Sequence, residues 1–184
     1  MKEVRAALER VGLLLLQDAR LPSLATLVAG GPLKGSWWGH PAGREIFRIA
    51  SALDDDEDVT TAKLVAGKVT FVHRRLFAAL AAAGGERAAW QMQKLPAAAR
   101  ALLADIDQAG ALEASGPAVK ELERRLLVAA HQVHTASGAH ATELTTWKRF
   151  RRATGTRVIT AARGRTELEA AADALGADRS LLPW

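Results

Sequence analysis

The 184-residue sequence contains no cysteine. This absence excludes a disulfide framework, a thiolate nucleophile and any metal site that relies on cysteine, and it suits a reducing cytoplasm. Near the N-terminus the sequence also lacks a long apolar run, because the stretch Leu13–Leu16 is flanked closely by charged residues. That stretch is too short for a signal sequence or a membrane span. We therefore expect a cytoplasmic protein that makes no membrane contact.

Familiar catalytic patterns are missing as well. The sequence has no glycine-rich phosphate-binding loop, no nucleophile elbow and no pair of carboxylates at a catalytic spacing. It therefore predicts a non-enzymatic protein with no catalytic residue, no cofactor and no bound metal.

Acidic residues are absent from residues 144–165, although the whole chain carries a net charge of only +5. This segment contains seven cations: Lys148, Arg149, Arg151, Arg152, Arg157, Arg163 and Arg165. Trp147 and Phe150 are interleaved with the first four, a composition typical of a surface that follows a phosphate backbone. The alternative is an ordinary solvated helix face. The segment favours contact with a polyanion.

A β-hairpin is the clearest predicted element. The runs 60–65 and 68–73 are rich in Val, Thr and Phe, and they flank Ala66-Gly67, a typical hairpin turn. Pairing Val65 with Lys68 would place Ala62 opposite Phe71. It would also leave four side chains on the wetter face: Lys63, Val65, Lys68 and Thr70.

Helices are expected on both sides of this hairpin. Apolar spacing and proline positions predict helices over 3–19, from Pro22 to about 30, over 41–53 and over 74–83. In the third of these helices, Phe47, Ala50 and Leu53 are expected to face the core. The acidic run 54–58 is interpreted as a solvated turn.

The second half repeats this plan in a shorter form. We expect a helix over 96–109, an edge strand over 111–114, a helix from Pro117, and strands over 127–135 and 139–147 joined by a loop at 136–138. The predicted divisions are a first domain (1–85), a helical connector (86–95), an abbreviated second domain (96–150) and a basic segment with a C-terminal helix (151–184). The fold class is α+β, mainly α with small β-hairpins.

This order of elements resembles the winged-helix superfamily, in a tandem, winged-helix-like arrangement. The strings Gly35–Pro41 and Lys63–Thr70 are also similar to strings in small bacterial proteins without an assigned activity. The resemblance implies a DNA-binding protein, either regulatory or nucleoid-associated. It leaves the oligomeric state open, with a homodimer as one alternative.

The resemblance also implies roles for particular residues. The helix before the wing would enter the major groove, where Arg44 and Arg48 would reach guanine or phosphate, and Lys63 and Lys68 on the wing would meet phosphates. A solvated helix face is the alternative for the two arginines. The acidic run 54–58 would oppose this contact, because it would repel a phosphate backbone.

The adjacent Trp37 and Trp38 have two interpretations. One indole can stack on a base, or one can fill the core while the other covers a domain interface or contacts a partner protein. We favour the second interpretation.

Two patterns leave other functions open. Gln91-Met92-Gln93 looks like the Gln-apolar-Gln motif of a bacterial DNA glycosylase family built from tandem winged helices, which implies a DNA-processing enzyme as the alternative. Glu45 or the pair His134/His140 would then be further site residues. A protein-interaction module, with the tryptophans and the acidic run as its contact, is the third hypothesis.

The histidines of the second hairpin do not predict a metal site. Strand geometry places His131 and His134 on opposite faces, and the expected pairing sets His134 opposite His140 and His131 opposite Glu143. Two imidazoles without a carboxylate on the same face make a poor zinc site.

Overall fold

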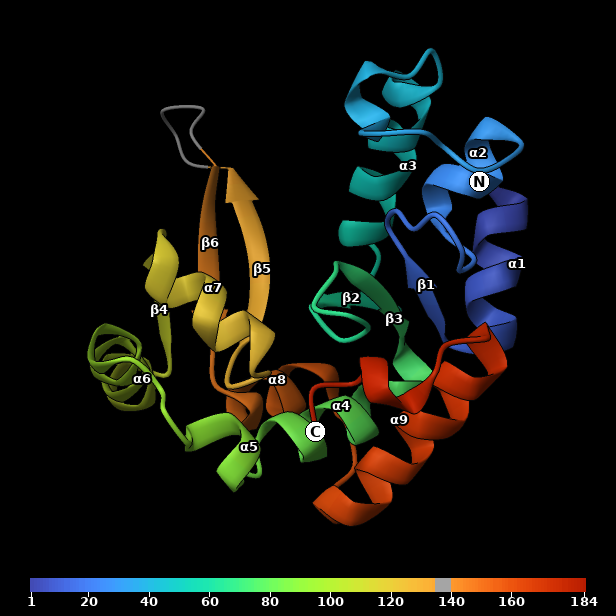
Figure 1. Ribbon diagram of the computed structural model, residues 1–184. Helices are drawn as coiled ribbons and strands as arrows, with labels where there is room; N and C mark the ends of the chain where they lie inside the picture. The colour runs from blue at the N-terminus through green and yellow to red at the C-terminus, as the bar shows by residue number, and fades with distance from the viewer. Residues whose placement is uncertain (135–139) are drawn as a thin grey trace. The chain divides into compact units, whose positions relative to one another are not determined.

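The computed structural model describes residues 1–134 and 140–184. Within them the chain is mixed α+β, with nine α-helices and two three-stranded antiparallel sheets (Figure 1). This confirms the predicted α+β class. In the described residues, no helix combines the length and the hydropathy needed to cross a membrane.

The chain divides into two compact units. Unit 1 comprises Met1–Leu76 and Glu169–Leu182, and unit 2 comprises Phe77–Leu168 and Pro183–Trp184. The division differs in extent from the predicted domains, because the chain returns to unit 1 near its C-terminus. No sequence pattern indicated this return.

Unit 1 combines helices with one three-stranded sheet. Its elements are α1 (Lys2–Val11), β1 (Leu13–Leu15), α2 (Leu24–Ala29), the short 3-10 helix η1 (Trp37–Gly39), α3 (Gly43–Asp54), β2 (Val59–Ala62), β3 (Thr70–His73), η2 (Arg74–Leu76), the end of α9 (Ala161–Leu175) and η3 (Arg179–Leu181). The sheet order is β1-β3-β2, so β1, a strand that the sequence did not predict, pairs with the second arm of the β2–β3 hairpin.

Strand β1 replaces the end of the helix predicted over 3–19. Helix α1 ends at Gly12, whose φ of 89° is a left-handed conformation that glycine adopts without strain. Leu13, Leu14 and Leu15 then pair with β3 and are all buried. The prediction was wrong here because a leucine run suits both a helix and a fully buried strand.

The hairpin of β2 and β3 forms, but its register differs by one residue from the prediction. The turn at Ala66-Gly67 is as expected, with positive φ at both residues and a bond from the Lys68 amide to the Val65 carbonyl. Phe71, however, pairs with Thr61 rather than Ala62.

One extra residue on the β2 side, a bulge-like insertion, causes this shift. It lets the consecutive side chains of Leu64 and Val65 both be buried. Thr70 is buried as well, and its hydroxyl accepts a hydrogen bond from the Val65 amide. The predicted wet positions of Val65 and Thr70 were therefore wrong.

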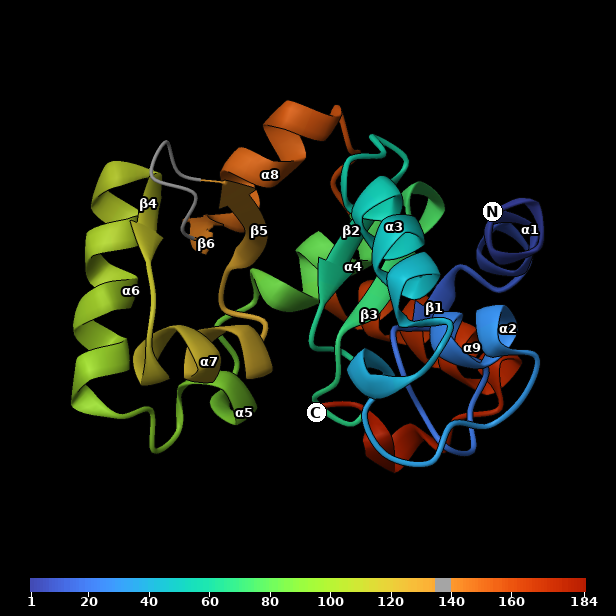
Figure 2. The ribbon, with the colours of Figure 1, turned by 90° about the horizontal axis from the view of Figure 1, so that it is seen from above.

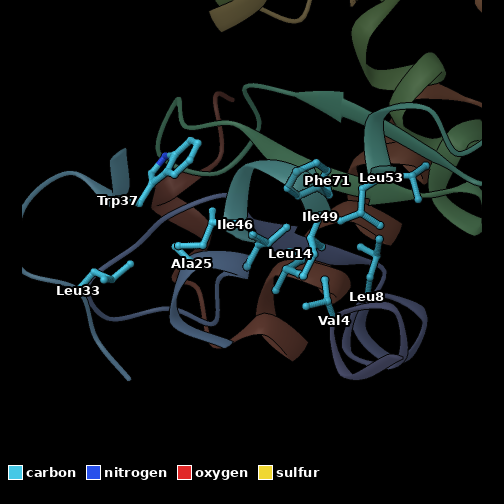
Figure 3. Packing of buried hydrophobic residues seen from close by; sticks show 12 residues of the cluster. Val4, Leu8, Leu14, Ala25, Leu33, Trp37, Ile46, Ile49, Leu53 and Phe71 are labelled. Carbon is cyan, nitrogen blue, oxygen red and sulfur yellow. The ribbon is translucent and has the colours of Figure 1, made fainter. Parts of the chain in front are cut away.

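The core of unit 1 lies between its helices and its sheet (Figure 3). Helix α3 contributes Ile46, Ile49 and Leu53, which recur at the spacing of one helix face. Phe47 was predicted to join them, but it is 46% exposed because it lies one position off that face. Ser23 caps α2, so this helix begins at Leu24 and not at Pro22.

Unit 2 contains the second sheet. Its elements are α4 (Phe77–Gly84), α5 (Ala89–Met92), α6 (Ala97–Ala109), β4 (Ala111–Ala114), α7 (Pro117–Arg124), β5 (Ala129–His134), β6 (His140–Thr145), α8 (Trp147–Thr154) and the start of α9. The sheet order is β4-β6-β5, and α6 and α7 pack on it through a shared apolar cluster (Figure 2).

The backbone pairing of unit 2 agrees with the prediction. Strand β4 is an edge strand over 111–114. His131 pairs with Glu143, and His134 pairs with His140. The predicted loop at 136–138 lies outside the described residues.

Candidate nucleic-acid interface

Helix α8 carries the first four cations of the basic segment. Its N-cap is Thr146, whose side chain accepts a hydrogen bond of 3.2 Å from the Arg149 amide. It ends at Gly155, which has a left-handed φ of 64°. The sequence thus supplies both a start signal and a stop signal for this helix of eight residues.

Aromatic side chains fix one side of α8 within unit 2. Trp147 is buried, and its Nε1 donates a hydrogen bond of 2.6 Å to the Leu126 carbonyl. Phe150 makes edge contacts with Phe77 and Trp147, with ring centroids 5.2 Å and 5.4 Å away. These contacts fix which side of the helix is buried and therefore which residues face solvent.

The remaining positions of α8 form a cationic face. Lys148, Arg149 and Arg152 are exposed, and Arg151 is half-buried. In the part of the chain that the structure describes, none of the four is in an ion pair. Helical spacing spreads them over the side opposite Phe150. Arg157 follows on the exposed link to α9, also without an ion pair among the described residues.

The last two cations of the basic segment differ, because acids compensate them. Arg163 donates to Glu167 at 2.8 Å, and Arg165 pairs with Glu86. Glu167 lies just beyond the acid-free segment and Glu86 is far away in sequence. Within the basic segment, the cations without an ion pair among the described residues are therefore those of α8 and Arg157.

In unit 1, the two arginines of α3 differ in whether they pair with an acid. Arg44 is exposed and forms no ion pair among the described residues. Arg48 holds both carboxylate oxygens of Glu45, at 2.8 Å and 2.6 Å. Its guanidinium lowers the pKa of the Glu45 carboxyl and has its own pKa raised by that hydrogen bond. Arg44 is thus the more available of the two.

The two lysines of the unit 1 hairpin, Lys63 and Lys68, are also constrained. Lys68 donates to Asp18 at 2.6 Å, and Lys63 is half-buried. Burial alone would raise the pKa of Asp18, but hydrogen bonds from Lys68 and from the Leu21 and Arg20 amides lower it to about 2. This carboxylate was not predicted as a partner, because it lies fifty positions from Lys68.

The acidic run after α3 is partly neutralised within unit 1. Asp56 pairs with Arg5, and Asp58 pairs with Arg74 at 2.8 Å. The run therefore repels a phosphate backbone less than its five acids suggest.

The two adjacent tryptophans, Trp37 and Trp38, differ in burial. Trp37 is buried at 6% exposure, which agrees with the interpretation that one indole fills the core. Trp38 is 67% exposed and stacks on Trp37 with ring centroids 4.0 Å apart. Phe47 of α3 lies beside it, with ring centroids 5.8 Å apart.

The Gln-apolar-Gln string has a structural explanation. Gln91 is fully buried, and its Nε2 donates to the carbonyls of Gly84 at 2.8 Å and Arg125 at 3.0 Å. Its Oε1 accepts from the Ala88 amide. The side-chain amide is therefore occupied by backbone groups, while Gln93 is exposed on the following turn.

In the described residues, no group of three or more His, Asp or Glu side chains is arranged to hold a metal ion. Comparisons with protein-family models, with curated proteins and with solved structures find no match to this chain.

Proposed function

We propose that this protein is a non-enzymatic DNA-binding protein, regulatory or nucleoid-associated, that acts in the cytoplasm. The observation that carries the proposal is the cationic face of α8. Four cations lie on eight residues without an acidic partner among the described residues, on a helix that Trp147 and Phe150 fix in place. A rigid array of unpaired cations attracts a polyanion, and each phosphate that it neutralises releases counterions.

The order of elements supports a winged-helix interpretation of both units. Unit 1 runs helix, strand, two helices and a hairpin, with the first strand paired to the second arm of the hairpin. The part of unit 2 from α6 to β6 runs helix, strand, helix and hairpin with the same sheet order, with one helix rather than two between the first strand and the hairpin. In this proposal the units are tandem winged-helix-like modules, and α3 and α7 correspond to the helices that precede a wing.

The contact would be mainly with phosphates. Lys148, Arg149, Arg151, Arg152 and Arg157 are its main residues, and Arg44 is the available cation on α3. Arg48, Lys63, Lys68, Arg163 and Arg165 are weaker candidates, since Arg48, Lys68, Arg163 and Arg165 pair with acids, and Lys63 is half-buried and already interacts with another group of the protein. Affinity without strong sequence preference follows from such a residue set.

Binding to labelled duplex and single-stranded DNA, followed by fluorescence anisotropy across a salt series, tests the proposal. Micromolar or tighter binding that weakens steeply with salt supports it. Absence of binding to either form at low salt overturns it and makes a protein partner the next target, with Trp38 and Phe47 as the candidate contact.

A further inference from the structure

We infer that Trp38, together with Phe47 and Arg44, is a stacking platform for an unpaired nucleobase. This inference rests on the proposed DNA-binding function and specifies its ligand: a strand with exposed bases, such as single-stranded or locally opened DNA. None of these three side chains takes part in the cationic face of α8.

Exposure of large aromatic side chains is the first observation. Trp38 and Phe47 are 67% and 46% exposed, although unit 1 buries the neighbouring Trp37 and Ile46 almost completely. Two large apolar side chains that touch at the surface mark an interaction site more often than a single one does. Their ring centroids lie 5.8 Å apart at an interplanar angle of 40°.

The platform is held in place before any ligand binds. Trp38 is stacked at 4.0 Å and 23° on Trp37, whose own ring is anchored in the core. The side-chain amide of Gln17 holds the loop beneath, donating to the Gly35 carbonyl at 2.6 Å and accepting from the Trp37 amide at 3.4 Å. Stacking of a ligand on Trp38 therefore requires little further ordering of the protein.

Close approach of α3 adds to this rigidity. Gly43 begins α3, and a Cβ atom there would lie 2.9 Å from the Trp37 carbonyl and 3.2 Å from the Trp38 carbonyl. Only a residue without a side chain allows this contact. It brings the first turn of α3, which carries Arg44 and then Phe47, against the tryptophan loop.

Charge decides which ligand fits. Residues 19–44 contain Arg20, Lys34 and Arg44, all exposed, and no acidic residue. The next acid, Glu45, is already bound to Arg48. A flat aromatic plane next to the first turn of α3, where Arg44 forms no ion pair among the described residues, is complementary to a planar heterocycle carried on a phosphate chain, which is a nucleobase in a single strand.

The test compares two single strands of equal length and equal phosphate number, an oligothymidylate and an abasic oligonucleotide. The wild-type protein should bind the base-bearing strand at least about fivefold more tightly, which is the effect of about 1 kcal/mol of stacking. Trp38→Ala should remove this preference and leave the affinity for the abasic strand unchanged. Trp38→Phe should restore part of it, since a phenyl ring still stacks.

Two further variants make the result specific. Leu27→Ala removes another exposed apolar side chain of unit 1 and should leave the preference intact. Gln17→Ala loosens the loop and should reduce the preference without removing any ring. Circular dichroism of each variant verifies its fold.

The outcomes separate the two proposals. If the wild-type protein binds neither strand nor a duplex, the proposed DNA-binding function fails. If it binds both strands equally and Trp38→Ala changes neither affinity, DNA binding stands and the stacking platform is overturned.

Discussion

The indole Nε1 of Trp147 donates a hydrogen bond of 2.6 Å to the backbone carbonyl of Leu126. This bond joins the first residue of the basic helix α8 to the chain that follows α7, within unit 2. Leu126 has a positive φ of 50°, and the Gln91 amide reaches the same carbonyl at 3.4 Å. A non-glycine residue adopts this conformation only where surrounding contacts stabilise it, and the hydrogen bond from Trp147 is one of these contacts.

Replacing Trp147 by Phe tests the importance of this bond. The ring contact with Phe150 remains, but the Leu126 carbonyl loses its shorter hydrogen bond, so the free energy of unfolding should fall by about 1 kcal/mol. Chemical denaturation measures it. Trp38→Phe is the matched control and should change stability by less than about 0.5 kcal/mol, because Trp38 is exposed. Equal effects of the two substitutions would contradict this role of the Trp147 bond.

Substitution of Gln91 and Gln93 tests whether Gln91 has a structural role or belongs to a catalytic site. Gln91→Ala should lower the free energy of unfolding by about 2–3 kcal/mol, because it leaves the buried Gly84 carbonyl and the Ala88 amide without these partners. Gln93→Ala removes an exposed side chain and should change stability little. Thermal and chemical denaturation measure both. A stable Gln91→Ala protein would reopen the interpretation of this string as a site motif.

Asp18 provides a pH-dependent test of the Lys68 contact. Its pKa is lowered to about 2 in the folded protein, so the charged carboxylate stabilises the fold above about pH 4. This contribution is lost as the pH falls from about 4 through 2. Asp18→Asn should therefore be less stable than the wild type at pH 7, by about 1–2 kcal/mol, and the difference should shrink in acid.

Urea denaturation at several pH values between 2 and 7 measures this difference. Asp105→Asn is the control, because Asp105 is exposed and forms no ion pair among the described residues. A difference between the wild type and Asp18→Asn that is constant across this range would show that the carboxylate charge is not what stabilises the contact between Asp18 and Lys68.

The second unit was the more predictable from sequence. Its hairpin pairs as expected, with His131 opposite Glu143, because a short loop leaves few choices of register. The edge strand over 111–114 was found from the turn signals on both sides of it, Gly110 and Ser115-Gly116.

Unit 1 was harder for two local reasons. Leu13–Leu15 continues the apolar spacing of α1, and only Gly12 reveals that the helix stops there. In the β2–β3 hairpin, Leu64 and Val65 are both buried, which strict alternation does not allow, and the extra residue shifts the pairing. A bulge of this kind depends on tertiary packing, which no local pattern records.

The sequence predicted which cations make up the candidate site, but it did not predict which of them form ion pairs with acids. The cations of α8 were all named, and the structure leaves them without acidic partners among the described residues. The partners of Arg165 and Lys68 lie far away in sequence, at Glu86 and Asp18, so local patterns could not indicate them. The exposure of Trp38 beside Phe47 likewise depends on how α3 is rotated, which the choice of core face decides.

The most direct test of the account compares two triple variants that lose the same net charge. The first removes exposed cations of the α8 face: Lys148→Gln, Arg149→Gln and Arg152→Gln. The second removes three exposed arginines that are paired with acids and are not candidate contacts: Arg74→Gln, Arg124→Gln and Arg179→Gln. Duplex binding is measured against salt for both variants and for the wild type.

The account predicts that the first variant loses at least tenfold in affinity and that its log–log salt slope falls by about 2–3, since each phosphate contact contributes about 0.9. The second variant should stay within about threefold of the wild type. Equal losses in the two variants would show that only net charge matters, and unchanged binding by the first would contradict the assignment of DNA binding to α8.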